Sequence, residues 1–177
     1  MSLLELTPPE KADGKLAELY AESEQFFGSV PNNVRMLGVS PAVLENQFDF
    51  AKYFFAHKTL SVPFLAMVRM LVSTASGSPY CQGLNSGMLR QQGITTEQIE
   101  KAKADPQKAP INDKEKALLL FVLAAIKEPH SVDAAQIDAL KKLGWTDSDI
   151  FDALAHGSRS VATNILFDAF KVRQDSC

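Results

Sequence analysis

Apolar side chains recur along most of the chain at intervals of three and four residues. In the segment that Ser40 opens, the apolar positions three or four residues apart are Leu44, Phe48, Ala51 and Phe55. That spacing places side chains on one face of an α-helix, and a serine followed by a proline is a typical helix start. No segment shows the sustained alternation of a β-strand, so the fold class is predicted to be all-α, a helical bundle.

Turn and cap residues divide the rest of the chain into further helices. The predicted helices cover about residues 9–27, 34–37, 64–76, 78–92, 113–128, 132–143 and 147–171, and one more begins with the capping box of Thr95 and Gln98. The segment after Pro63, FLAMVRMLVSTAS, is apolar nearly all round, and Arg69 is its only charge. It is therefore predicted to be the central buried helix.

Length and composition are those of an ordinary globular protein. The 177 residues fit one domain over 1–177, with 172–177 expected as a flexible tail, and 46% are hydrophobic against 22% charged. A net charge of −3 gives no reason to expect nucleic acid or an anionic membrane as a partner. The longest apolar run, ALLLFVLAAI, is too short to cross a bilayer, and the N-terminal residues do not have the pattern of a signal peptide. Two cysteines do not make a disulfide scaffold, so a reduced, cytoplasmic protein is expected.

The residue with the clearest chemical potential is Cys81. Ser78 and Pro79 have the pattern of an N-cap and a first helical residue, which places the Cys81 thiol in the first turn of a helix. Unpaired backbone N–H groups and the positive end of the helix dipole favour a thiolate there, and the thiolate is the nucleophilic form. The alternative is that Cys81 is a small buried apolar residue, as most free cysteines are.

Two other residues have possible roles. His156 has Asp152 four residues before it on the same predicted helix, so it is a candidate base, although a lone helical histidine is more often a hydrogen-bonded or surface residue. Arg69 lies on an apolar helix and is expected either to pair with an acidic residue or to face a cleft, since an unpaired buried guanidinium is too costly. The histidines lack metal-ligand spacing and there is no phosphate-binding loop, so we expect no metal and no cofactor.

Three segments together resemble one known family. MVRMLVSTASGSPYCQGLNSGMLRQQGITTEQI is similar to the core helix pair of the alkylhydroperoxidase D-like and carboxymuconolactone decarboxylase superfamily. GSVPNNVRMLGVSPAVLE and DIFDALAHGSRSVATNI, which ends near Asn164, resemble the N-terminal part and the closing helix of its longer, peroxidase-related members. The resemblance covers nearly the whole chain and implies the same helical fold.

The thiol motif of that family is only partly present. Its enzymes use a glutamate, a Cys-x-x-Cys pair and a histidine; here the second cysteine is Cys81, and the other positions fall on Ala66, Ser78 and Asn85. Serine cannot form the disulfide, and alanine and asparagine cannot relay protons near neutral pH. The decarboxylase branch has a histidine at the position of Asn85, so that pattern is broken too. We therefore do not expect a two-cysteine catalytic cycle.

Three functions remain open from the sequence. The first is one-cysteine peroxide or thiol chemistry at Cys81, an antioxidant activity of peroxidase or peroxiredoxin type, weakened by the motif changes, in which an external thiol or Cys177 resolves the oxidised cysteine. The second is a non-thiol enzyme acting on a small organic acid or lactone with Arg69 or His156. The third is a catalytically silent protein that binds a ligand or partner. The resemblance also implies a homo-oligomer, a dimer, trimer or hexamer, and the widely apolar predicted helices suggest the same.

Overall fold

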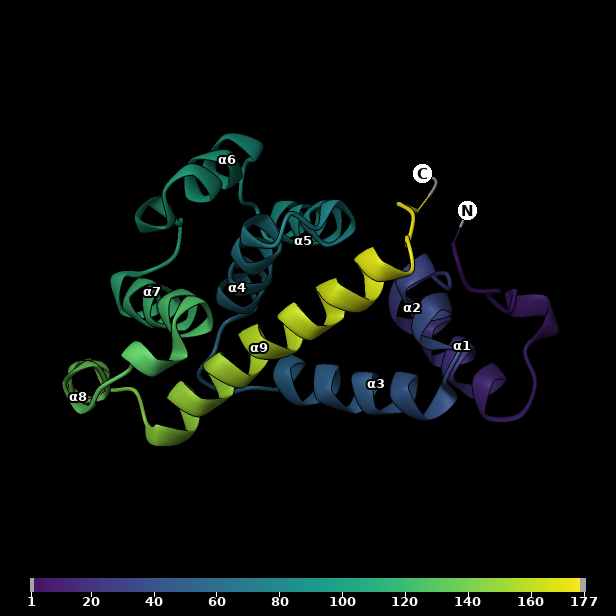
Figure 1. Cartoon of the computed structure of the whole chain (residues 1–177), viewed down its shortest axis with the longest axis horizontal. Helices are drawn as coiled ribbons and strands as arrows, with labels where there is room; N and C mark the ends of the chain where they lie inside the picture. The colour runs from purple at the N-terminus through teal and green to yellow at the C-terminus, as the bar shows by residue number, and fades with distance from the viewer. Residues whose placement is uncertain (1, 176–177) are drawn as a thin grey trace. The chain divides into compact units, whose positions relative to one another are not determined.

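The computed structural model describes residues 2–175, and Figure 1 shows its helices in chain order. The described residues form helices and connecting turns without a β-strand, so the all-α prediction is confirmed. The α-helices are α1 (Gly14–Phe27), α2 (Asn32–Leu37), α3 (Pro41–Phe55), α4 (Val62–Ala75), α5 (Pro79–Gln91), α6 (Thr96–Ala104), α7 (Asp113–Lys127), α8 (Ala134–Lys142) and α9 (Asp147–Ala169).

Cap residues explain where several helices begin. Thr95 caps α6: its hydroxyl accepts from the Gln98 N–H at 3.2 Å, while the Gln98 side chain accepts from the Thr95 N–H at 2.9 Å. The prediction placed the start of α8 at Val132, but the Asp133 side chain caps the Gln136 N–H at 2.9 Å, so the helix begins one residue after this aspartate. Similarly, α1 begins at Gly14, and residues Pro9–Lys11 form a separate 3-10 turn.

The described residues divide into two compact units, and the first consists of residues 2–56 together with 165–175. Within it, α1 and α3 run in the same direction. Two ion pairs show this: Lys15 pairs with Glu45 at 2.7 Å near the start of both helices, and Glu22 pairs with Lys52 at 2.9 Å further along both. The backbone N–H of Asn32 donates to the Asp175 carboxylate at 2.7 Å, so the described part of the expected tail has a partner. Residues 176 and 177 lie outside the described residues.

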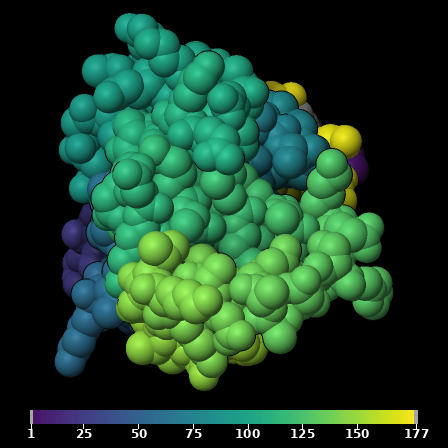
Figure 2. All heavy atoms as spheres, turned by 90° about the vertical axis from the view of Figure 1, so that its left-hand side faces the viewer, coloured from purple at the N-terminus to yellow at the C-terminus, as the bar shows by residue number. Residues whose placement is uncertain are grey.

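The second unit, His57–Asn164, is built around α4. Helices α5, α6 and α7 all contact α4, and α4 and α5 lie side by side (Figure 1). Nine of the 14 residues of α4 are buried, which confirms the prediction of a central buried helix. Figure 2 shows the face of this unit formed by α6, α7, α8 and the start of α9, with colours from teal to yellow-green.

Glycine at position 157 lets α9 approach the core of the second unit closely. A Cβ atom there would lie 2.7 Å from Ile126 Cδ1 and 2.8 Å from Val122 Cγ1, both on α7, and 3.4 Å from Val68 Cγ1 on α4. A larger side chain would therefore push α9 away from both helices. This close approach fixes the position of the neighbouring His156 relative to α4.

Each helix within residues 2–175 is either too short or too polar to span a membrane.

Candidate active site around Cys81

Cys81 is the third residue of α5, as predicted from the preceding serine and proline. Ser78 is the N-cap residue and is fully buried, and Pro79 is the first helical residue. The reduced Cys81 side chain is only 5% exposed. The thiol is thus close to the positive end of α5 and largely shielded from water, two conditions with opposite effects on thiolate stability.

Arg69 of α4 connects the surroundings of Cys81. Its Nε donates to Asn85 Oδ1 at 2.8 Å, its Nη1 lies 3.0 Å from His156 Nε2, and its Nη2 donates to Met88 Sδ at 3.3 Å. Asn85 and Met88 belong to α5, and His156 to α9. One guanidinium therefore joins three helices of the second unit. We call these five residues, Arg69, Cys81, Asn85, Met88 and His156, the Cys81 cluster.

Asn85 links Arg69 to the first turn of α5. While its carbonyl oxygen accepts from Arg69, its Nδ2 donates to the backbone carbonyl of Cys81 at 2.8 Å. The side chain is 3% exposed and bonds in both directions. At the position where the resembling family has a histidine, this chain has a residue that orients a cation and moves no proton.

A negative charge on Cys81 interacts favourably with the Arg69 guanidinium. Burial lowers the pKa of the Arg69 guanidinium to about 10, while the negative charge of the Cys81 thiolate acts to raise it. The guanidinium is therefore cationic at neutral pH. The expectation of an acidic partner for Arg69 is wrong: within residues 2–175 its hydrogen-bond acceptors are neutral and no carboxylate forms an ion pair with it.

His156 is held in its neutral form. Its side chain is 5% exposed, and burial, assisted by the charge of Arg69, lowers its pKa to about 3, while the nearby Leu65 backbone acts in the opposite direction. Its Nε2 faces the Arg69 guanidinium, which can only donate, so Nε2 accepts and the ring proton resides on Nδ1. Asp152, its neighbour along the helix, bonds to His57 instead.

The structure brings together part of the predicted set of site residues. Asn85 and His156 both bond to Arg69, and Asn85 also bonds to the backbone carbonyl of Cys81. Ala66, one turn before Arg69, is fully buried and supplies no polar side-chain atom. Sequence reasoning missed Met88. Its only sequence signal is that it lies three residues after Asn85, which places both side chains on one side of α5.

A second buried amide supports the turn between α4 and α5. Asn164 Nδ2 donates to Ser76 Oγ at 2.8 Å, and Asn164 Oδ1 accepts from Ser73 Oγ at 3.3 Å. Gln82 Nε2, next to Cys81, donates to the Ser73 carbonyl at 3.3 Å. These bonds attach the end of α4 both to α9 and to the start of α5, and they give Asn164 a structural role.

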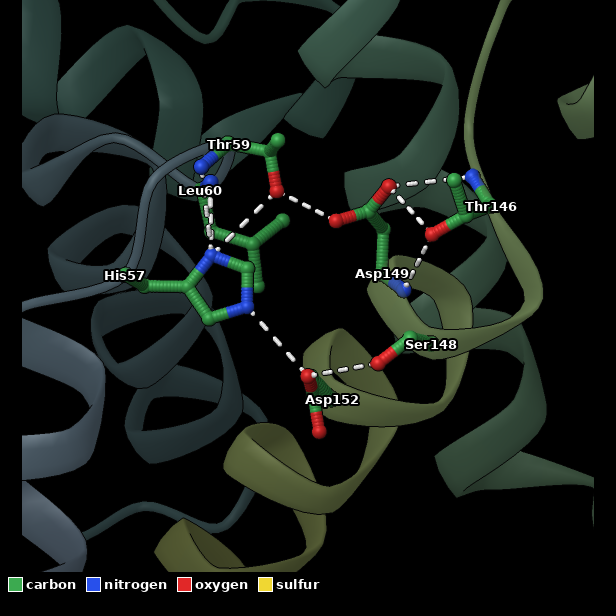
Figure 3. A network of polar contacts seen from close by, with 7 residues as sticks. All are labelled: His57, Thr59, Leu60, Thr146, Ser148, Asp149 and Asp152. Carbon is green, nitrogen blue, oxygen red and sulfur yellow. Dashed lines mark hydrogen bonds and ion pairs between the residues drawn. The ribbon is translucent and has the colours of Figure 1, made fainter.

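A separate network joins the loop before α4 to the start of α9 (Figure 3). His57 Nδ1 accepts from the Leu60 N–H at 3.1 Å, and its Nε2 donates to Asp152 at 3.2 Å. Asp149 accepts from the hydroxyl of Thr59 and from the Thr146 N–H, the latter at 3.0 Å. These contacts fix the N-terminal ends of the two helices that carry Arg69 and His156.

Solved structures with the same arrangement of helices include two peroxidase-related proteins. The alkylhydroperoxidase AhpD core from Ralstonia eutropha JMP134 has a TM-score of 0.87 at 22% identity, covering 99% of this chain and 93% of that one. A peroxidase-related protein from Silicibacter sp. TM1040 has a TM-score of 0.84 at 19% identity, covering 99% and 92%.

A third match is the debrominase Bmp8, whose cysteine-to-alanine variant was crystallised with 2,3,4-tribromopyrrole; the TM-score is 0.79 at 19% identity, covering 99% of this chain and 95% of that one. No protein-family model matches this sequence, and the search of curated proteins gives no match. The fold expected from the resemblance is confirmed: the chain has the fold of the alkylhydroperoxidase AhpD core.

Proposed function

We propose that this chain is a member of the alkylhydroperoxidase D-like proteins and that it performs one-cysteine thiol chemistry at Cys81, with a peroxide as the electrophile. The observation that carries the proposal is the partly buried Arg69 guanidinium, which has only neutral acceptors and which Asn85 links by two hydrogen bonds to the backbone carbonyl of Cys81. A negative charge on Cys81 acts to raise the pKa of Arg69, so the two charges interact favourably. A buried cation stabilises an adjacent thiolate, and the thiolate is the form that attacks peroxide.

The reaction uses few protein groups. The Cys81 thiolate attacks one peroxide oxygen, a sulfur–oxygen bond forms, the oxygen–oxygen bond breaks, and the leaving oxygen takes a proton from water. Cys81 is then a sulfenic acid. Because Ser78 occupies the place of a resolving cysteine, an external thiol completes the cycle, and a dithiol reductase is a poor partner.

A second candidate is thiol-dependent removal of a halogen from a small aromatic compound. It is supported by the match to a debrominase that was crystallised as a cysteine-to-alanine variant with a brominated pyrrole. Both candidates need the same nucleophile, Cys81. They differ in the electrophile.

Trapping of the oxidised cysteine tests the proposal. In a Cys177→Ser background, the protein is treated with hydrogen peroxide or cumene hydroperoxide, and the sulfenic acid is captured with dimedone and located by mass spectrometry. We expect an adduct on Cys81 that forms at least about tenfold faster than on free cysteine at the same pH, since free cysteine is mostly protonated.

The matched control is Cys81→Ser, which retains shape but has no thiol at this position. A parallel reaction with 2,3,4-tribromopyrrole and dithiothreitol, followed by bromide release, tests the second candidate. Folded protein that yields neither the adduct nor bromide contradicts thiol chemistry at Cys81 and favours a silent, ligand-binding protein.

A further inference from the structure

We propose that the thiol which regenerates oxidised Cys81 is a small anionic thiol, recruited by Arg69. The inference rests on the proposed function, because it requires Cys81 to form a sulfenic acid. It adds the chemical class of the second substrate, which the peroxide step leaves undefined.

The net charge of the Cys81 cluster changes when Cys81 is oxidised. In the thiolate state, the cysteine and Arg69 carry opposite charges. In the sulfenic acid, the negative charge is lost, while Asn85, Met88 and the neutral His156 contribute none. The oxidised site therefore contains a guanidinium whose counter-charge has been removed, which is unfavourable away from bulk water. A negatively charged ligand restores neutrality.

Arg69 offers a hydrogen-bond donor for such a ligand. Nε and Nη1 donate to good acceptors, the Asn85 oxygen and the His156 nitrogen, but Nη2 donates to the Met88 thioether at 3.3 Å. Thioether sulfur is a weak acceptor, so a carboxylate oxygen that displaces it forms a stronger, charge-assisted bond. The unbranched Met88 side chain can adopt other rotamers to allow this exchange.

Burial restricts the size of the thiol. Cys81 is 5% exposed, whereas Arg69 and Met88, taken as whole residues, are half-buried. A ligand that arrives from solvent thus meets Arg69 and Met88 more readily than the cysteine. A protein cysteine on a large partner is poorly suited to reach such a site, whereas a small thiol that carries a carboxylate can bind Arg69 and attack the sulfur.

The resolving steps balance without another oxidant. The thiolate of the small thiol attacks the Cys81 sulfur, a sulfur–sulfur bond forms, the sulfur–oxygen bond breaks, and the hydroxide takes a proton from solvent and leaves as water. A second molecule of the thiol attacks the small-thiol sulfur of the mixed disulfide. This releases the small disulfide and returns Cys81 as a thiolate beside Arg69.

The test compares thiols that differ in charge. Cys177→Ser protein is oxidised with peroxide, freed of the excess, and mixed with 3-mercaptopropionate, 2-mercaptoethanol or cysteamine at equal thiolate concentration, and loss of the dimedone-reactive species is followed by mass spectrometry. The rate is expected to fall in that order, with the anionic thiol about tenfold faster than the neutral one, since the full interaction of two charges in a partly buried site exceeds this factor.

Three variants test whether Arg69 causes the preference for the anionic thiol. Arg69→Gln should remove it, Arg69→Lys should retain most of it, and Arg90→Gln, which changes an exposed arginine at the end of α5, should leave it intact. Equal rates for the three thiols in the wild-type cluster, or an unchanged preference in Arg69→Gln, overturn the inference. If no sulfenic acid forms at all, the proposed function fails; if it forms and shows no charge preference, only this inference fails.

Discussion

The Arg69 guanidinium and the start of α5 both favour a negative charge on Cys81. The first turn of a helix stabilises a nearby negative charge by about 0.3–1 kcal/mol, less than one pKa unit. Burial opposes both effects by disfavouring the thiolate. Loss of the Arg69 charge should therefore make Cys81 less nucleophilic.

The buried, neutral His156 should make the stability of the protein depend on pH between neutral and acidic conditions. Its pKa is about 3 in the folded protein and about 6.5 when unfolded, so below about pH 6.5 the unfolded chain binds more protons and stability falls. We expect the wild type to lose about 2 kcal/mol of unfolding free energy between about pH 7.5 and pH 5 through this residue alone. Urea denaturation at the two pH values measures the loss.

The control for that measurement is His156→Gln, which keeps a hydrogen-bonding side chain but does not titrate. Between the two pH values, its unfolding free energy should fall by about 2 kcal/mol less than that of the wild type. An identical pH dependence for both proteins would show that His156 is not held neutral by burial and by Arg69.

Helix starts could be predicted from the sequence because caps are local. The serine–proline pairs at Ser40 and Ser78 and the capping box at Thr95 each set a helix start within a few residues of its expected position. Contacts between side chains of different helices could not be predicted in this way. Arg69 bonds to residues 16 and 87 positions away, and only the packing of α4, α5 and α9 brings them together.

The junction of α9 with the loop before α4 depends on Asp149. Burial acts to raise the pKa of its carboxyl, but hydrogen bonds from Thr146 and Thr59 outweigh this effect and lower it. Asp149→Asn should reduce the unfolding free energy by about 1–2 kcal/mol, because it weakens both the α9 cap and the bond to Thr59. Thermal or urea unfolding at neutral pH measures the change.

Asp147→Asn is the matched control, since this carboxylate is in the same helical turn but its side chain is 78% exposed. A change within about 0.5 kcal/mol is expected there. The difference between the two variants should also disappear in acid, as the carboxylate of Asp149 becomes protonated. Equal stability of both variants at neutral pH would contradict a structural role for Asp149.

Two of the widely apolar predicted helices, α3 and α4, differ in how their apolar faces are used in the structure. The apolar faces of α4 are buried within the second unit, so they give no support to an interface between chains. Helix α3 retains exposed apolar side chains at Val43, Tyr53 and Phe55, which are 44%, 52% and 53% exposed. The sequence pattern could not distinguish these cases, because an apolar face looks the same whether its partner is another helix or another chain.

We therefore expect a homo-oligomer in which α3 contributes apolar contacts. Sedimentation at micromolar concentration should give a mass that is a multiple of 19.4 kDa. The double change Tyr53→Ser and Phe55→Ser should weaken the assembly, since it removes apolar area that an interface would bury. A single species of 19.4 kDa for the unaltered chain contradicts the expectation.

The central claim is that Cys81 is a reactive thiolate stabilised by Arg69, and titration of its alkylation rate tests it most directly. Iodoacetamide labelling of Cys81 is measured against pH in a Cys177→Ser background, with Arg69→Gln alongside. We expect a midpoint below the value of about 8.5 for a free thiol, and a higher midpoint in Arg69→Gln. A midpoint at or above the free-thiol value in the protein that retains Arg69 would contradict the account.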